Sequence, residues 1–193
     1  MATFDQIFRK NHYDIKTAIS KSRTWFDQQA RLLSGNSQIV PQRLIRTNAE
    51  QNVTKIVPGE LYLFNYDAKH QDTLPYWDTF PLVFPFRKMP DGFVGLNMHY
   101  LPYQLRIALL DRLMTFKTNS AMDETTRLKL SWGTISALSG QFHAQSCVHR
   151  YLLDHVKSPL KRIDSPDWAT AMMLPVERFV GSTKQKVWKD SLR

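Results

Sequence analysis

The sequence has one cysteine, Cys147, and no long apolar run, and each shortage excludes a class of protein. A single cysteine cannot form an internal disulfide, so we expect the protein in a reducing compartment such as the cytoplasm. Cys147 itself is expected to be a small buried side chain. No apolar stretch approaches the roughly 20 residues that span a bilayer, and the N-terminus is too polar for a signal peptide. The sequence therefore predicts a soluble protein with no membrane partner.

Glycine is also scarce, with seven scattered residues in a chain of 193. They form no glycine-rich phosphate loop, which argues against nucleotide hydrolysis. The 42% hydrophobic and 12% aromatic content is that of a globular protein. A chain of this length suits one domain with its own core and terminal extensions.

Positive charge is plentiful, and it lies at the two ends of the chain. Of the net charge of +9, residues 1–56 carry +5 and residues 181–193 carry +3, whereas residues 57–122 are neutral and residues 123–180 carry +1. Basic flanks on a neutral body are typical of a polyanion partner, most plausibly nucleic acid, because each neutralised phosphate releases a counterion. A solvated, lysine-rich surface is the alternative.

The periodicity of apolar residues changes along the chain. Helical spacing predicts a helix over 13–33, and the polar stretch 36–56 reads as a linker. Apolar runs separated by turn residues predict strands at 60–66, 80–86 and 93–100, with the last two joined as a hairpin through Pro90-Asp91-Gly92. Pro81 and Pro85 cannot donate ladder hydrogen bonds, so the second strand should be bent or lie at an edge.

Helices are expected again in the second half. The predicted helices are 102–116, 124–138 capped by Asp123, and 147–156 capped by Ser146, followed by a helical turn from Ser165 to Trp168 and a last strand over 172–179. The apolar stripe of the second helix is formed by Leu128, Trp132, Ile135 and Leu138. The predicted fold is α+β, with a small barrel-like antiparallel sheet of roughly four or five strands flanked by N-terminal and C-terminal helices. Three segments follow: a basic helical arm and linker (1–56), a core domain (57–180) and a basic tail (181–193).

Histidines and the cysteine cluster late in the chain, which raises the possibility of a metal site. His143, Cys147, His149 and His155 fall within thirteen residues, and His143 and Cys147 could share a helical face as zinc ligands. No second cysteine and no repeated ligand pair is present, so structural roles are favoured. A Cys147 nucleophile paired with His149 is disfavoured, because residues two apart on a helix do not face each other.

Carboxylates gather around the first two predicted strands. Glu60, Asp67, Lys69, Asp72 and Asp78 form a set that could hold Mg²⁺ for phosphodiester cleavage. Their spacing matches no nuclease pattern closely, so polar loop residues at the end of the sheet are the favoured interpretation. We predict no catalytic residue, no metal and no cofactor.

The stretch LPYWDTFPLVFPF, residues 74–86, is rich in aromatic residues and proline. Most of its aromatic side chains are expected in the core of the sheet. Tyr76 and Trp77 lie in its polar loop, where they could stack on unpaired bases. Packing or a protein interface is favoured for both, because tyrosine and tryptophan are enriched at interface hot spots.

Four stretches together resemble a known family. They are YLFNYDAKHQDTLPYWDTFPLVFPF, DGFVGLNMHYLPYQLRIALLDRL, DETTRLKLSW and LPVERFVGSTKQKVWKDS, and they cover about residues 60–190. In order and spacing they resemble the DNA end protector, or head-completion, virion proteins of T4-like tailed phages and cyanophages. The chain departs from that pattern at Ala68, where the family has proline, and at Trp77, where it has a second tyrosine.

The resemblance implies a non-enzymatic virion protein, found in the host cytoplasm during assembly, that binds a packaged DNA end near the portal or neck. We expect sequence-independent contacts with double-stranded DNA that block exonuclease. The candidate DNA-binding residues are Lys16, Lys21, Arg23, Arg31, Lys184, Lys186, Lys189 and Arg193. Tyr76 and Trp77 are candidates for contact with portal, neck or baseplate proteins in a multi-subunit assembly.

An architectural neck or baseplate subunit of a contractile-tailed phage, with no direct DNA role, is the alternative. Such a subunit would use the aromatic loop and the terminal arms to clamp its neighbours, since long polar arms that become ordered on assembly are common in that class.

Overall fold

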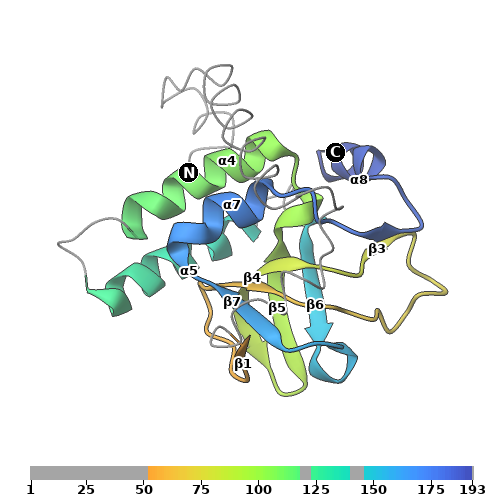
Figure 1. Ribbon diagram of the computed structural model, residues 1–193, viewed down its shortest axis with the longest axis horizontal. Coiled ribbons are helices and arrows are strands. Elements are labelled where there is room, and N and C mark those ends of the chain that lie inside the picture. Colours follow the sequence, from red (N-terminus) through yellow and green to blue (C-terminus); the bar gives the residue numbers. More distant parts are fainter. Residues whose placement is uncertain (1–51, 118–122, 140–145, 193) are drawn as a thin grey trace, which may run out of the picture.

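The computed structural model describes residues 52–117, 123–139 and 146–192, in which helices pack on one side of an antiparallel sheet (Figure 1). In chain order the strands are β1 (Asn52–Val53), β2 (Leu61–Leu63), β3 (Trp77–Asp78), β4 (Leu82–Met89), β5 (Gly92–Asn97), β6 (Val148–Leu152), β7 (Leu160–Ile163) and β8 (Phe179–Val180). The helices are η2 (Met98–Tyr100), α4 (Tyr103–Lys117), α5 (Glu124–Ser139), η3 (Leu153–His155), η4 (Ser165–Asp167), α7 (Trp168–Met173) and α8 (Lys184–Ser191). None of these helices has the length and apolar content needed to cross a membrane.

The main sheet is open, so the predicted barrel is wrong although the α+β class is right. Six strands pair in the order β1-β7-β2-β4-β5-β6, and β1 and β6 form its two edges within the described residues. Helices α4, α5 and α7 lie together against one face of the sheet (Figure 1). A sheet covered by helices on one face buries its apolar side chains without closing on itself.

The predicted hairpin is present as β4 and β5, joined at Pro90-Asp91. Strand β4 lies inside the sheet, between β2 and β5, so the edge position inferred from its prolines is wrong. The predicted bend is confirmed by a register shift between Pro85 and Arg87, where a β-bulge interrupts the pairing. Pro85 lies beyond the part of β4 that pairs with β2. There its carbonyl accepts a 3.0 Å hydrogen bond from the Gly59 backbone nitrogen, and the pairing does not need the N–H group that proline lacks.

Two apolar clusters lie on opposite faces of the sheet. The larger one, between the sheet and the helices, includes Phe80, Phe84 and Trp168, all fully buried. The smaller one is mainly aromatic, with Phe93 stacked on Tyr151 at a ring distance of 5.3 Å. The aromatic-rich middle of the sequence therefore supplies the core, as predicted.

Helices α4 and α5 match their predicted ranges closely. Asp123 caps α5, because its carboxylate accepts a 2.9 Å hydrogen bond from the Thr126 backbone nitrogen. Trp132 was predicted on the buried stripe of α5 beside Ile135, but only Ile135 is buried, and Trp132 is 44% exposed.

Two predicted elements in the second half are wrong in type. The helix predicted over 147–156 is strand β6 followed by η3, because Val148 and Tyr151 suit a strand and the free edge of β5 was available for pairing. The strand predicted over 172–179 is instead the end of α7 and an irregular segment leading to β8. The turn opened at Ser165 continues as helix through Met173, and Pro175 then prevents further helix.

The helix predicted over 13–33 and most of the linker over 36–56 lie outside the described residues. Residues Asn52 and Val53, at the end of that linker, form edge strand β1. The division into arm, core and tail stays a prediction.

Candidate nucleic-acid interface

The C-terminal basic segment forms helix α8, which packs on the body of the protein. Thr183 caps the helix, its hydroxyl accepting a 3.4 Å hydrogen bond from the Lys186 backbone nitrogen. Val187 and Ser191 are buried on the inner face. The Trp188 indole donates a 2.8 Å hydrogen bond to the carbonyl of His99 in η2. These contacts fix the position of α8 relative to the end of β5.

The outer face of α8 presents lysines to solvent. Lys186 and Lys189 are exposed and three residues apart, so they share a face. Lys184 is partly engaged, with its amino nitrogen 3.5 Å from the Glu177 carboxylate and 5.6 Å from the centre of the Trp188 ring. Lys184 and Lys186 lie in the first turn, where positive charge opposes the helix dipole and costs rather than adds stability. Lys189 lies in the last turn, where positive charge favours the helix, so only the two first-turn lysines are placed against the dipole.

The other predicted DNA contacts cannot be placed on a surface. Lys16, Lys21, Arg23, Arg31 and Arg193 lie outside the described residues. The structure thus brings together only the α8 lysines from the predicted set.

The two predicted interface aromatics belong to a small ribbon of β3 and β8. Tyr76 points inward, with its ring 6.0 Å from that of Tyr100 and its hydroxyl 3.5 Å from the Asp190 carboxylate of α8. Trp77 pairs with Val180, which is 41% exposed, on the face of the ribbon opposite the buried Asp78. Nearby Leu74 is also 41% exposed. Trp77 therefore fits an outward-facing contact better than Tyr76 does.

Asp78 from the possible nuclease set is buried in a polar network. Its carboxylate accepts hydrogen bonds from the backbone nitrogens of Phe80 (3.0 Å) and Arg178 (3.1 Å) and lies 2.7 Å from His99 Nδ1. Burial alone would raise the pKa of Asp78, but the attraction and hydrogen bond of His99 and the two backbone donors lower it below its usual value. Asn97 also donates to it at 3.3 Å. With its acceptor positions engaged and its side chain shielded, Asp78 holds β3, β5 and β8 together.

The cysteine and histidines of the possible metal site do not share a helix. Cys147 directly precedes β6, His149 lies within β6, and His143 lies outside the described residues. Burial raises the pKa of the Cys147 thiol to about 11 and lowers the pKa of His149 to about 4. In the described part of the chain, no three His, Cys, Asp or Glu side chains are grouped to hold a metal ion.

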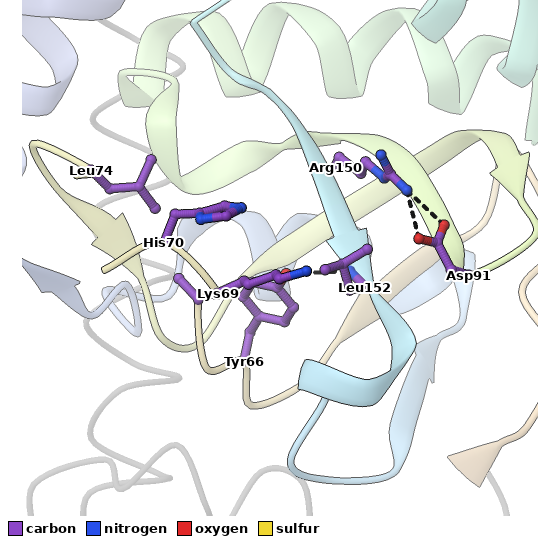
Figure 2. Close-up of a pocket in the computed structure, with 8 residues that line it drawn as sticks. Tyr66, Lys69, His70, Leu74, Asp91, Arg150 and Leu152 are labelled. Carbon is purple, nitrogen blue, oxygen red and sulfur yellow. Dashed lines mark hydrogen bonds and ion pairs between the residues drawn. The ribbon is translucent and has the colours of Figure 1, made fainter. Parts of the chain in front are cut away.

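A surface pocket of about 250 Å³ lies between the loop after β2 and the outer edge of β6 (Figure 2). The Tyr66 hydroxyl accepts a 3.2 Å hydrogen bond from the Leu152 backbone nitrogen and so ties the loop to the strand edge. At the other side of the pocket, Arg150 Nη2 donates to both Asp91 oxygens, at 2.8 and 2.6 Å. The pocket lining also includes Ala68, Lys69, His70 and Leu74.

A second basic surface, missed by the sequence reasoning, lies at the turn end of the β4–β5 hairpin. Arg87 and Arg150 flank Val94 on neighbouring strands and therefore point to the same face of the sheet. Lys88, the next residue of β4, pairs with Phe93 and points to the opposite face of the sheet. Trp132 and Lys129 of α5 lie on the side of Arg87, because the Trp132 indole donates a 2.7 Å hydrogen bond to the Phe86 carbonyl and α5 packs on the helix-covered face. We call the set Arg87, Lys129, Trp132 and Arg150 the hairpin-end surface; its three cations are exposed. The Arg87-Lys88 pair before the turn was the only signal in the sequence, and the neutral charge of residues 57–122 concealed it.

An α+β body that presents exposed lysines and arginines on a docked helix and at a hairpin end has the features of a protein that binds DNA phosphates without reading sequence. Comparison with protein-family models identifies the family of DNA-binding protein: residues 1–191 match the family described as the phage T4 terminal DNA protecting protein. The chain belongs to this family, and it is thus a phage protein that protects DNA ends, as the resemblance predicted. No curated protein and no solved structure matched the chain in two further comparisons.

Proposed function

We propose that this protein protects a DNA end without catalysis, by occupying the end of the packaged duplex near the portal or neck of the virion. The observation that carries the proposal is the docked helix α8, which holds Lys186 and Lys189 outward on a fixed support. Membership in the terminal DNA protecting family supplies the ligand. Lys184, Arg193 and the N-terminal Lys16, Lys21, Arg23 and Arg31 extend the phosphate contacts, and a blocked end is inaccessible to exonuclease.

A protein contact accompanies the DNA contact in this proposal. Trp77 and Val180 offer an outward apolar patch on the β3–β8 ribbon, which is suited to a portal or neck subunit. If DNA binding were absent, the same patch would favour the purely architectural neck or baseplate role. The proposed locations are the virion and, during assembly, the host cytoplasm.

The test is a titration of the full chain against blunt linear DNA and the covalently closed circle of the same sequence, at two salt concentrations, with and without Mg²⁺. We expect tighter binding to linear DNA and a steep loss of affinity with salt. Replacing Lys186 and Lys189 by Gln should reduce the log–log salt slope by about two, at about 0.9 per phosphate contact.

The double variant Lys55→Gln and Lys157→Gln is the matched control, because it removes two exposed lysines that lie outside α8. Equal salt slopes in the two double variants would contradict the role of α8. Binding of neither DNA would leave the architectural role, and Mg²⁺-dependent degradation of the linear DNA would show that the protein is an enzyme.

A further inference from the structure

Trp132 combines exposure with a fixed ring position. Its side chain lies on α5, where its helical spacing predicted burial, yet the residue is 44% exposed. The hydrogen bond from its indole nitrogen to the Phe86 carbonyl, at 2.7 Å, holds that edge of the ring against β4 at the bulge. A large aromatic surface is thus presented to solvent at low conformational entropy, as in binding hot spots.

Cations on three elements lie on the same side of the sheet as this ring. Lys129 lies one helical turn before Trp132 on α5, Arg87 follows the residue that accepts the indole hydrogen bond, and Arg150 is across Val94 from Arg87. Asp91 is the one carboxylate bonded to this group within the described residues, and only the Nη2 atom of Arg150 contacts it there. Like charges on one face repel one another, and Arg87 and Lys129 gain no ion pair from the described residues that would offset this, so an exposed tryptophan beside them points to an anionic partner with an apolar face.

A blunt duplex end has that chemistry. Its last base pair exposes a flat aromatic face that internal base pairs keep stacked, and the phosphates of both strands surround that face. Stacking on an aromatic side chain tolerates any sequence, because every base has a π-face. A closed circle offers the phosphates but not the face.

We propose that Trp132 stacks on the terminal base pair of a blunt DNA end while Arg87, Lys129 and Arg150 contact the phosphates next to it. This inference rests on the proposed function and adds the group that distinguishes an end from the middle of a duplex.

The experiment compares a short blunt duplex with a dumbbell of the same sequence whose two ends are closed by hairpin loops. We expect the wild-type chain to prefer the blunt duplex. Trp132→Ala should weaken binding to the blunt duplex about 5- to 150-fold and leave the affinity for the dumbbell unchanged. Trp77→Ala, which removes an outward tryptophan on the β3–β8 ribbon, is the matched control and should keep the wild-type preference.

A second readout covers the case in which Trp132→Ala fails to fold. Stacking should quench the Trp132 fluorescence when the blunt duplex is added, and Trp132→Phe, which keeps a stacking ring, should lose that quench while retaining most of the end preference. A folded Trp132→Ala protein with an unchanged blunt-to-dumbbell ratio would overturn the inference, and so would equal wild-type affinity for the two DNAs. In both of those outcomes DNA binding itself survives, whereas binding to neither DNA would overturn the proposed function as well.

Discussion

At the scale of single residues, the buried polar side chains are held by partners from distant parts of the chain. Arg106 of α4 is fully buried and donates to the carbonyls of His99 (3.0 Å), Leu101 (2.8 Å) and Met172 (2.9 Å). Asp78 binds backbone nitrogens of two segments a hundred residues apart. Removing one partner of such a hydrogen bond lowers the free energy of unfolding, because the other donor or acceptor stays buried without a partner.

Asp78→Asn should destabilise the protein strongly. In either orientation, the asparagine amide would place its NH₂ group against the backbone N–H groups of Phe80 and Arg178 or against the Asn97 amide, so at least one buried donor would lose its acceptor. Breaking a buried pair in this way costs about 3–5 kcal/mol of unfolding free energy. Urea unfolding at pH 7 measures it, with Asp72→Asn, an exposed carboxylate of the preceding loop, as the control. An equal loss of unfolding free energy in the two variants would show that the buried network around Asp78 does not stabilise the fold.

His149 should make stability fall as the pH is lowered. Burial lowers its pKa in the folded protein to about 4 from 6.5, so the unfolded chain takes up a proton first. The contribution of His149 to the free energy of unfolding is complete above pH 6.5 and is lost on acidification towards pH 4. It amounts to roughly 3 kcal/mol at most. Asp78, whose pKa is lowered, contributes stability that is lost only below its ordinary pKa of 3.8.

The measurement is the unfolding free energy from urea titrations between pH 7 and pH 4. His149→Gln should flatten the dependence over this window, and His70→Gln, which removes an exposed histidine, should keep it. A wild-type stability that does not change across the window would contradict the assignment to His149.

At the scale of elements, replacing two glycines by alanine should change stability in opposite directions. A Cβ on Gly92 would lie 1.9 Å from the Tyr151 carbonyl oxygen, so Gly92→Ala forces β5 and β6 apart and should cost about 1–3 kcal/mol. Gly133 of α5 has nothing within 4 Å of such a Cβ, and Gly133→Ala should add about 0.5–1 kcal/mol through helix propensity. Thermal unfolding checks both changes, and a shift in the same direction for the two variants would contradict the strand packing.

Helix α8 should detach when its inner face is made polar. Val187 is fully buried, so Val187→Asp should cost about 3 kcal/mol or more in the docked state and release the helix. Detachment would expose Trp188 and shift its fluorescence to longer wavelength, with a parallel loss of DNA affinity. Gln185→Asp introduces the same charge on the exposed face and should leave the fluorescence unchanged. A docked Trp188 signal in Val187→Asp would refute the packing role.

The elements also show where local sequence is a sufficient guide. Helices α4 and α5 and the β4–β5 hairpin were predictable, because a cap, a turn and a long periodic run each act locally. The short segments 147–156 and 172–179 were not, since a run of this length fits either period and pairing with β5 or packing against the sheet decided its form. Trp132 was predicted to be buried because helical spacing shows which side chains share a face of a helix. It does not show which part of that face another element covers.

At the scale of the whole molecule, the charge map predicts a steep salt dependence. If all eight cations of the proposed function contact phosphates, the log–log salt slope for binding to a DNA end should be about −7, and the three cations proposed beside Trp132 would bring it to about −10, at about 0.9 per contact. Exonuclease protection should fall along the same curve, and the measurement is the digestion rate of end-labelled DNA at a series of salt concentrations. A slope near −2 would leave only about two phosphate contacts and contradict the larger set of cations.

The sequence by itself determined the α+β class, the aromatic core, the family and the basic character of the chain ends, because composition, short-range periodicity and motif order are properties of the chain alone. Only the tertiary structure decided that the sheet is open, that α8 is docked and that Arg87, Lys129, Trp132 and Arg150 share one surface. Those outcomes depend on contacts between residues tens of positions apart. No local pattern encodes such contacts, because each strand edge and helix face is completed by whichever distant segment reaches it.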